Sequence, residues 1–368
     1  MSTLCIEKNG DITEYVLCEG DLPLRYERVS ASGSVQPEDI FLAKADRVCA
    51  GLEAMFVKLG NGLQAFLPFS ECVNGVPASG MLIPVQVKRA PHGNKCAYVS
   101  RDISLAGKYL ILLPYSRTVS VSTRITDPQE RNRLLAIAHE NIEGFGAILR
   151  TQAENIPDSD IISEVEELKA AFRRLEERIA SSSVPCRLSG DSNPAEVFLR
   201  DEKDIERVLC SEPMALSVPV TVTEKPISAK LRRELEQSFR RNLWLPCGGY
   251  LTVDLCEALT VFDVNSGKYT GSGKSADKSF LKLNTEAARK CAEILRLRNI
   301  GGNILIDFVD MKTDEERDAV IDTMTEAFRQ DRAKTVIYGF TKLGLMEISR
   351  KRTGTVQTYT SSPEKEEQ

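Results

Sequence analysis

Two aspartates at the ends of apolar runs are the residues of this chain best suited to chemistry. Asp263 ends the run ALTVFDV, Asp307 lies in NILIDFVDM, and Asp310 follows shortly after it. A carboxylate on an apolar strand is costly unless it is paired, hydrogen-bonded or bound to a metal. Two carboxylates that leave positions for water suit Mg²⁺, which binds phosphate oxygens and can activate a water. The pattern predicts a magnesium site for phosphate chemistry; the alternative is that both aspartates cap turns.

The stretch that follows Asp263 resembles a phosphate-binding loop, since it reads NSGKYTGSGKSADK. A P-loop requires G-x-x-x-x-G-K-S, but Lys268 stands where the run GKS at 273–275 would need a glycine. The dinucleotide fingerprint also fails, because no third glycine follows in register. We interpret the stretch as a flexible basic loop near substrate, and an NTPase is the second enzyme hypothesis.

The elements that position the two aspartates are expected to be strands and helices in alternation. LTVDL and ALTVFDV read as strands, and a helix that opens at Asn284 precedes the strand NILIDFVDM. Thr313 and Glu316 form a capping-box pattern for the next helix, which leads to the strand KTVIYGF. This order predicts an α/β unit with parallel strands, in which the aspartates lie on strands that are adjacent or one apart.

The first part of the chain is strand-rich and the middle is mixed. Short runs separated by glycine, asparagine and proline over residues 38–102 indicate a small antiparallel barrel. Asp127 and Pro128, with Glu130 reaching back, predict a helix start. Apolar residues at three- and four-residue spacing predict an amphipathic helix over 160–180.

The composition is that of an ordinary globular protein. The 368 residues are 42% hydrophobic and 27% charged, enough for two or three compact units. The start of the chain lacks a signal peptide pattern, and no apolar run is long enough for a membrane span, so we expect a cytoplasmic protein. The ten cysteines form no C-x-x-C pair of the kind that binds zinc, and we expect them to be reduced thiols. The net charge of −5 argues mildly against nucleic-acid binding, although a local basic surface can coexist with it. The densest positive cluster, either a solvated face or a phosphate contact, comprises Arg232, Arg233, Arg240 and Arg241.

Several long segments resemble the ribonuclease E/G family, in the family's own order. They read LTVFDVNSG, NTEAARKCAEILRLRNIGGNILIDFVDM, FRQDRAK and GLMEISRKR. The resemblance implies an endoribonuclease in which Asp263 and Asp307 bind the catalytic Mg²⁺. It also implies that Asn265 supports this arrangement by hydrogen bonding, as a third catalytic residue.

The resemblance covers nearly the whole chain and implies a multi-subdomain fold of the α+β and α/β classes. We expect an RNase H-like subdomain from residues 1–37 and 184–238, an inserted S1-type OB-fold RNA-binding barrel over 38–102, a 5′-sensor region over 103–183, a DNase I-like α/β catalytic subdomain over 239–355 and a disordered tail over 356–368. The RNase H-like subdomain is structural in the family, so we assign it no chemistry.

Four positions match the family's RNA contacts in the barrel. Phe56 and Phe66 fall where the family stacks bases on aromatic rings, although without the resemblance both would be expected in the core. Lys95 and Arg89 match basic positions that contact RNA.

Two further segments, SLAGKYLILLP and ILRTQA, resemble the family's sensor for a 5′-monophosphate. The resemblance implies that Gly107 and Ile111 line this pocket, and that Arg150 and Thr151 bind the terminal phosphate. An arginine fork together with backbone and hydroxyl donors suits such a group.

The sequence departs from the family pattern in three respects. The C-P-x-C zinc link and the small domain beyond it do not occur before Gln368, so zinc and a zinc-linked tetramer are not expected, while another homo-oligomer stays open. Thr123 stands where a second arginine is often found beside Arg124, and Lys334 replaces another arginine near the sensor. Lysine cannot reproduce bidentate geometry, so we expect weaker discrimination of the 5′ end.

Taken together, these features predict a magnesium-dependent endoribonuclease that cleaves single-stranded, AU-rich RNA and leaves 5′-phosphate ends. A preference for 5′-monophosphorylated RNA and a role in rRNA processing or mRNA decay follow from the resemblance. The alternative is a non-catalytic RNA-binding protein of the same fold. Both carboxylates and Asn265 are present, which favours the enzyme.

Overall fold

The described chain forms two compact units, one of which is inserted into the other. Unit 1 comprises Met1–Gly33 and Asp204–Gln368, and unit 2 comprises Ser34–Lys203. The computed structural model describes residues 2–30, 35–73, 75–91, 95–189, 193–202, 205–267, 276–329 and 331–359, with only the backbone described over 276–279. The loop residues 268–275, on which the NTPase hypothesis depends, and residues 360–368 of the expected tail lie outside these ranges.

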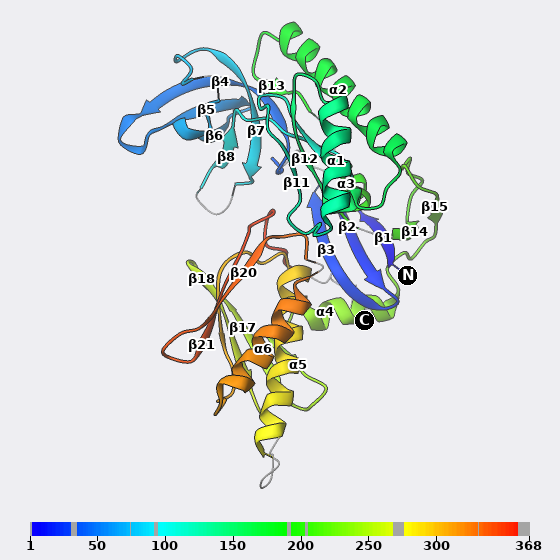
Figure 1. Cartoon of the computed structure of the whole chain (residues 1–368), viewed down its shortest axis with the longest axis vertical. Helices are drawn as coiled ribbons and strands as arrows, with labels where there is room; N and C mark the ends of the chain where they lie inside the picture. Colours follow the sequence, from blue (N-terminus) through cyan, green and yellow to red (C-terminus); the bar gives the residue numbers. More distant parts are fainter. Residues whose placement is uncertain are drawn as a thin grey trace, which may run out of the picture. The chain divides into compact units, whose positions relative to one another are not determined.

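In unit 1, the N-terminal strands form one sheet with strands from far along the chain (Figure 1). Its spatial order is β15 (Val220–Val222), β14 (Ile205–Cys210), β1 (Ser2–Asn9), β2 (Ile12–Glu19) and β3 (Leu22–Ser30). Helix α4 (Ala229–Ser238) begins at Ser228, whose hydroxyl accepts the N–H of Leu231. Leu231 and Leu235 pack with Tyr26 of β3 in a common core, so the helix is fixed to this sheet by apolar burial.

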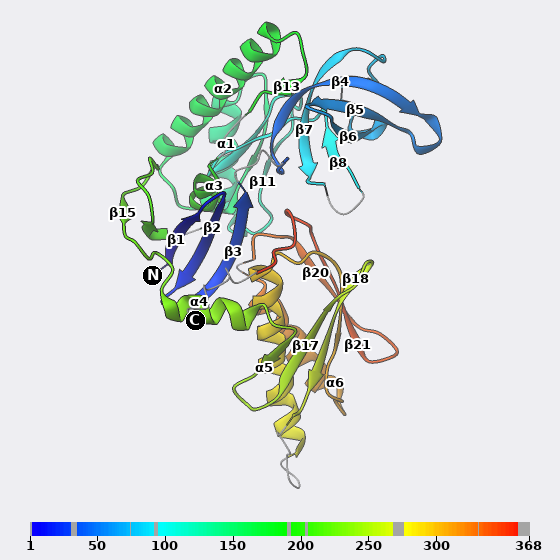
Figure 2. The same cartoon turned by 180° about the vertical axis from the view of Figure 1, so that it is seen from behind.

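The second sheet of unit 1 carries the predicted catalytic residues. Its spatial order is β16 (Asn242–Trp244), β17 (Tyr250–Leu255), β18 (Leu259–Asn265), β19 (Gly302–Asp307), β21 (Leu345–Arg350) and β20 (Thr335–Phe340). Helices α5 (Ala276–Leu297) and α6 (Asp314–Ala327) cover one face of it, as Figures 1 and 2 show. The apolar residues of this face and of both helices form one core.

The expectation of parallel strands is right for β18 and β19 and wrong for the rest of this sheet. β21 pairs antiparallel with both β19 and β20. The physical reason is the short connection over residues 341–344, because a tight hairpin forces its two strands to run in opposite directions.

The predicted helix boundaries are confirmed at α6 and wrong at α5. Thr313 and Glu316 form the expected capping box. Asn284 does not open α5, because the helix already begins at Ala276 and Asn284 lies inside it. Apolar packing extends the helix upstream, since Phe280 also contacts the core.

Unit 2 begins with the predicted small barrel. Its strands are β4 (Ile40–Cys49), β5 (Ala54–Gly60), β6 (Leu63–Pro68), β8 (Ala97–Ser100) and β7 (Leu82–Arg89), and a short strand β13 (Cys186–Arg187) adds to β4. Pairing between β4 and β7 closes the barrel, which is antiparallel except at β6–β8. Alternate residues of each strand fill its interior.

The rest of unit 2 is a small mixed sheet with helices. The sheet order is β11 (Val119–Val121), β12 (Gly146–Leu149), β10 (Leu110–Leu113) and β9 (Leu105–Ala106). The helices are α1 (Pro128–Asn141), α2 (Asp158–Ser181) and α3 (Pro194–Asp201), with 3-10 turns at Ala50–Leu52, Phe69–Glu71 and Thr151–Ala153.

Both predicted helices of unit 2 are present. The Asp127 carboxylate accepts the N–H of Gln129 at the start of α1, as expected. Glu130 does not reach back to the cap; it binds Arg133 and accepts the N–H of Asn155 instead. The amphipathic helix is α2, and among the described helices none is long and apolar enough to cross a bilayer.

Candidate functional site

Asp263 and Asp307 lie directly opposite each other on the parallel strands β18 and β19. They are Cα partners in the register, which confirms that their strands are adjacent. Their neighbours Phe262 and Ile306 are fully buried in the core under α5 and α6. Because side chains alternate along a strand, both carboxylates project from the other face of the sheet, where both residues are exposed.

The two carboxylates form a like-charged pair. Partial burial and the negative charges of Asp263 and Asp310 raise the pKa of Asp307 above its ordinary value. Asn265 donates its Nδ2 hydrogen to Oδ2 of Asp263 over 2.8 Å, which orients that carboxylate. This donor set of carboxylate oxygens with space for water fits Mg²⁺. Among the described residues, no group of three or more His, Cys, Asp or Glu side chains forms a metal cluster.

A buried amide holds the segment between Asp307 and Asp310. Asn284 of α5 is fully buried; its Nδ2 donates to the carbonyl of Val309 over 2.7 Å, and its Oδ1 accepts the N–H of Val309 over 3.1 Å. The sequence indicated Asn284 as a helix cap and missed this role. A polar residue at an otherwise apolar helix position is the signal that points to it.

A glycine allows the close approach of chain segments beside Asn265. A Cβ atom at Gly249 would lie 2.8 Å from the carbonyl oxygen of Asn265 and 2.4 Å from Cδ1 of Leu283. Any other residue at Gly249 would therefore push the β17 hairpin away from β18.

The barrel in unit 2 brings the predicted aromatic residues together on its outer face. Phe56 and Phe66 are register partners with ring centroids 5.8 Å apart, and both are half-buried. Tyr98 continues the row, with its ring 6.3 Å from that of Phe66. The sequence analysis missed Tyr98, although the alternation of AYVS could have placed it on the outer face.

Basic side chains border this aromatic row. Cζ of Arg89 lies 4.1 Å from the ring centroid of Tyr98, and Cζ of Arg47 lies 5.4 Å from that of Phe56. Lys95 is exposed, and no described residue binds its side chain. The structure therefore groups Arg89 with the rings but leaves Lys95 free of them.

Two of the predicted sensor residues contact each other directly. Nη1 of Arg150 donates to the Gly107 carbonyl over 2.6 Å, while Nη2 pairs with Asp201 over 3.0 Å. The hydroxyl groups of Thr151 and Ser122 lie 3.0 Å apart. The Arg150 guanidinium is thus engaged by groups of its own chain.

Ile111 lies nearby on β10, and its segment is held by an acid that the sequence analysis missed. Ile111 pairs with Ala106, so it lies beside Gly107. The carboxylate of Glu164 on α2 accepts three successive backbone N–H groups, from residues 108, 109 and 110, at 2.5, 2.7 and 2.9 Å. Glu164 therefore fixes the loop that carries Gly107.

Comparison with known proteins identifies the family of the chain. The sequence profile of the Ribonuclease E/G family matches residues 104–225 and 219–353. The chain belongs to the ribonuclease E/G family. It is 32% identical to ribonuclease G of Escherichia coli (strain K12) over 370 residues, which cover 90% of this chain and 75% of that protein.

Ribonuclease E proteins of two cyanobacteria are similarly related. The identity is 30% over 364 residues for Synechocystis sp. and 32% over 364 residues for Nostoc sp.. The alignments cover 89% of this chain but 54% and 53% of those proteins, so the chain spans about half their length.

Two of the four arginines in the basic cluster of this ribonuclease E/G family member, Arg232 and Arg241, form ion pairs. Arg232 pairs with Glu7 at 2.5 Å and with Glu14 at 3.3 Å. Arg241 forms a bidentate pair with Asp254, with N–O distances of 2.7 and 2.8 Å. These ion pairs compete with phosphate binding at Arg232 and Arg241, whereas Arg233 and Arg240 are exposed, so both alternatives raised by the sequence stay open.

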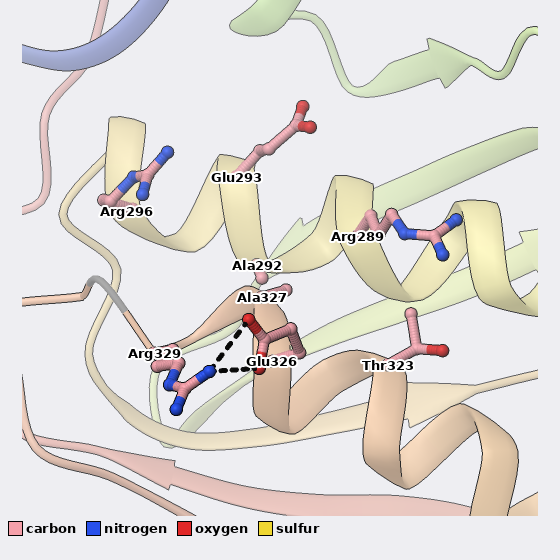
Figure 3. Close-up of a pocket in the computed structure, with 8 residues that line it drawn as sticks. All are labelled: Arg289, Ala292, Glu293, Arg296, Thr323, Glu326, Ala327 and Arg329. Atoms are coloured by element: carbon pink, nitrogen blue, oxygen red, sulfur yellow. Dashed lines mark hydrogen bonds and ion pairs between the residues drawn. The ribbon is translucent and has the colours of Figure 1, made fainter.

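A groove of about 340 Å³ lies between α5 and α6 (Figure 3). Figure 3 shows Arg329 turned towards Glu326, with which it forms an ion pair. The groove belongs to the helix layer, whereas the Asp263–Asp307 pair is on the opposite face of the sheet. It is therefore separate from the candidate catalytic site.

Proposed function

We propose that this chain is a magnesium-dependent endoribonuclease whose catalytic centre is the Asp263–Asp307 pair. The observation that carries the proposal is the register of β18 and β19, which sets the two carboxylates side by side on an open sheet face. Membership of a family whose relatives are named ribonuclease E and ribonuclease G supports it.

The residues of the site have distinct parts in the proposed mechanism. Asp263 and Asp307 would hold Mg²⁺, which when bound supplies water activation and neutralises charge on the phosphate. Asn265 keeps Asp263 in one orientation through its hydrogen bond. Asn284 keeps the backbone after Asp307 in place through both bonds to Val309. The open sheet face leaves room for a phosphodiester to approach both carboxylates.

We propose single-stranded, AU-rich RNA as the substrate, with products that carry 5′-phosphates, in rRNA processing or mRNA decay. The row of Phe56, Phe66 and Tyr98 supports base stacking on the barrel, and Arg89 and Lys95 add positive charge. The ten cysteines are free thiols, as is usual in a reducing compartment, and we propose the cytoplasm as the location.

We also propose a 5′-monophosphate preference that depends on Gly107, Ile111, Arg150 and Thr151. The grouping of Gly107, Ile111 and Arg150 supports it. Since Arg150 is bound to Asp201, a terminal phosphate must compete with that carboxylate. The RNase H-like, 5′-sensor and DNase I-like subdomain assignments belong to the same proposal.

A cleavage assay tests the central claim. Single-stranded AU-rich RNA is incubated with Mg²⁺ and the wild type, Asp263→Asn, Asp307→Asn or the control Asp322→Asn, which removes an exposed carboxylate from α6. We expect the two site variants to lose about 100-fold or more in rate, because a lost ligand removes several kcal/mol of transition-state stabilisation. The control should cut normally.

Equal cleavage by all variants would refute the active-site assignment. Binding without any cleavage by the wild type would instead favour the non-catalytic RNA-binding alternative. The 5′-end preference fails if a 5′-hydroxyl RNA is cut as fast as the same RNA with a 5′-monophosphate.

A further inference from the structure

The only tryptophan of the chain, Trp244, lies with its indole largely in solvent. It is 66% exposed, although it stands in a strand of a packed sheet. Its ring centroid is 5.3 Å from that of Tyr250 on the neighbouring strand, at an interplanar angle of 51°. An indole exposed to solvent contributes little hydrophobic burial to the stability of the fold, so we consider a binding role for this side chain.

The register puts this aromatic pair on the same sheet face as the carboxylates. Trp244 is the partner of Tyr250, and Tyr250 is the partner of Asn265. Leu243 and Leu251, next to Trp244 and Tyr250, are buried in the core under the helices. By alternation, Trp244 and Tyr250 project from the open face, as Asp263 and Asp307 do.

The pair is also close to the proposed catalytic centre. The row from Trp244 through Tyr250 ends at Asn265, whose amide binds Asp263. Neighbouring strands lie about 4.8 Å apart, so the backbone of Trp244 is roughly 10 Å from that of Asn265. A group held on the indole would therefore belong to a nucleotide close to the bond that is cut.

The charge around the pair selects the part of RNA that can bind there. Asp263 and Asp307 make this region negative, and Asp254, farther along β17, is already paired with Arg241. Without a bound metal ion the carboxylates repel a phosphate, whereas a nucleobase is neutral and has a π-face that stacks on an indole.

We propose that Trp244, supported by Tyr250, is a base-stacking platform that binds one nucleobase of single-stranded RNA next to the Asp263–Asp307 site. The proposal rests on the proposed ribonuclease function for its substrate. The platform holds the strand across the open sheet face and so helps to set which phosphodiester reaches the carboxylates. Stacking of this kind tolerates every base, so it contributes affinity and position more than sequence selectivity.

Tryptophan fluorescence tests the proposal directly, because all indole emission comes from Trp244. A short AU-rich RNA is titrated into the wild-type protein in EDTA, which prevents metal-dependent cleavage. Binding is followed in parallel by the anisotropy of a labelled copy of the same RNA. We expect emission to be quenched with the midpoint seen by anisotropy, and quenching to weaken when the RNA carries abasic sites.

The RNA affinity of Trp244 variants provides a second test. Trp244→Leu should weaken RNA binding about 5- to 150-fold, the usual loss for one base stack, while Trp244→Phe should keep most of the affinity. Tyr338→Leu is the matched control, since Tyr338 is 65% exposed at the opposite edge of the same sheet. Thermal unfolding shows whether each variant is folded, and the fluorescence titration of the wild type tests the platform even where Trp244→Leu is unstable.

Three outcomes overturn the platform: unchanged emission when anisotropy shows saturation, full affinity in folded Trp244→Leu, or no RNA binding at all. Cleavage in Mg²⁺ separates this proposal from the catalytic one. Cleavage without quenching refutes the platform alone, whereas quenching without cleavage refutes the nuclease alone.

Discussion

At the scale of single residues, the Asp263–Asp307 pair is expected to lower the stability of the sheet unless the proposed Mg²⁺ is bound. The two side chains are opposite each other across paired strands, and Asp310 adds a third negative charge nearby. Asn265 binds Asp263 without supplying a compensating positive charge. Like charges in such positions destabilise a sheet, and the proposed Mg²⁺ would neutralise them.

Replacing Asp307 with Asn is therefore expected to stabilise the protein in EDTA by about 0.2–1 kcal/mol, the usual size of a cross-strand charge effect. Mg²⁺ should raise the Tm of the wild type, because a ligand that binds only the folded state stabilises it, and should raise that of the variant less. Thermal unfolding with EDTA and with Mg²⁺ measures both. A variant that is less stable than the wild type in EDTA contradicts the repulsion argument.

Asn284 gives a second prediction at this scale. Asn284→Leu keeps the branched shape of the side chain but leaves the N–H and carbonyl of Val309 without their partners, which costs roughly 1–3 kcal/mol. It should also raise the Mg²⁺ concentration needed for half-maximal cleavage, because the segment after Asp307 becomes less ordered. Urea unfolding and a Mg²⁺ titration of the rate measure the two effects. A lower stability with an unchanged Mg²⁺ requirement would reduce Asn284 to a purely structural role.

At the scale of elements, the sequence predicted what local pattern determines and missed what distant segments determine. The capping box at Thr313 and the neighbouring strands of Asp263 and Asp307 follow from spacing and from the crossover rule. The pairing of Arg150 with Asp201 joins residues far apart in the chain, and no local pattern indicates it. Trp244 was not predicted either, because exposure depends on which sheet face the helices cover.

Glu130 in α1 leads to a prediction about pH. Hydrogen bonds from Arg133, together with one from the backbone of Asn155, lower the pKa of its carboxyl group. The stabilisation is therefore complete above the unfolded-state pKa of about 4.3 and is lost as the pH falls through the folded-state value. Glu130→Gln should cost roughly 1–2 kcal/mol near neutral pH.

Urea unfolding of the wild type and of Glu130→Gln, at about pH 7 and about pH 3, tests this linkage. The difference between the two proteins should be smaller at the lower pH, because the stabilisation by Glu130 begins to be lost below the unfolded-state pKa. Glu154→Gln, a nearby acid for which the structure describes no ion pair, serves as the control. An equal difference at both pH values contradicts the argument.

At the scale of the whole molecule, the chain consists of a continuous unit inserted into a discontinuous one. Unit 2 contains the barrel core and the core around α1 and α2, both formed from residues within 34–203. Unit 1 depends on both ends of the chain. β1 pairs with β14, and Tyr26 packs against Phe239 and Tyr359. The two units therefore differ in what they need in order to fold.

The fragment 34–203 should consequently fold alone, whereas the fragment 204–368 should not. The first keeps all strands of its barrel and of its second sheet. The second loses β1, β2 and β3, which exposes the apolar face of α4 and leaves one edge of β14 unpaired, with only β15 on its other side. Circular dichroism and urea unfolding of each fragment measure this, and joining residues 1–33 to 204–368 through a short linker is the matched control. The linked protein should unfold cooperatively. If the fragment 204–368 alone is stable and unfolds cooperatively, the N-terminal strands are dispensable for unit 1.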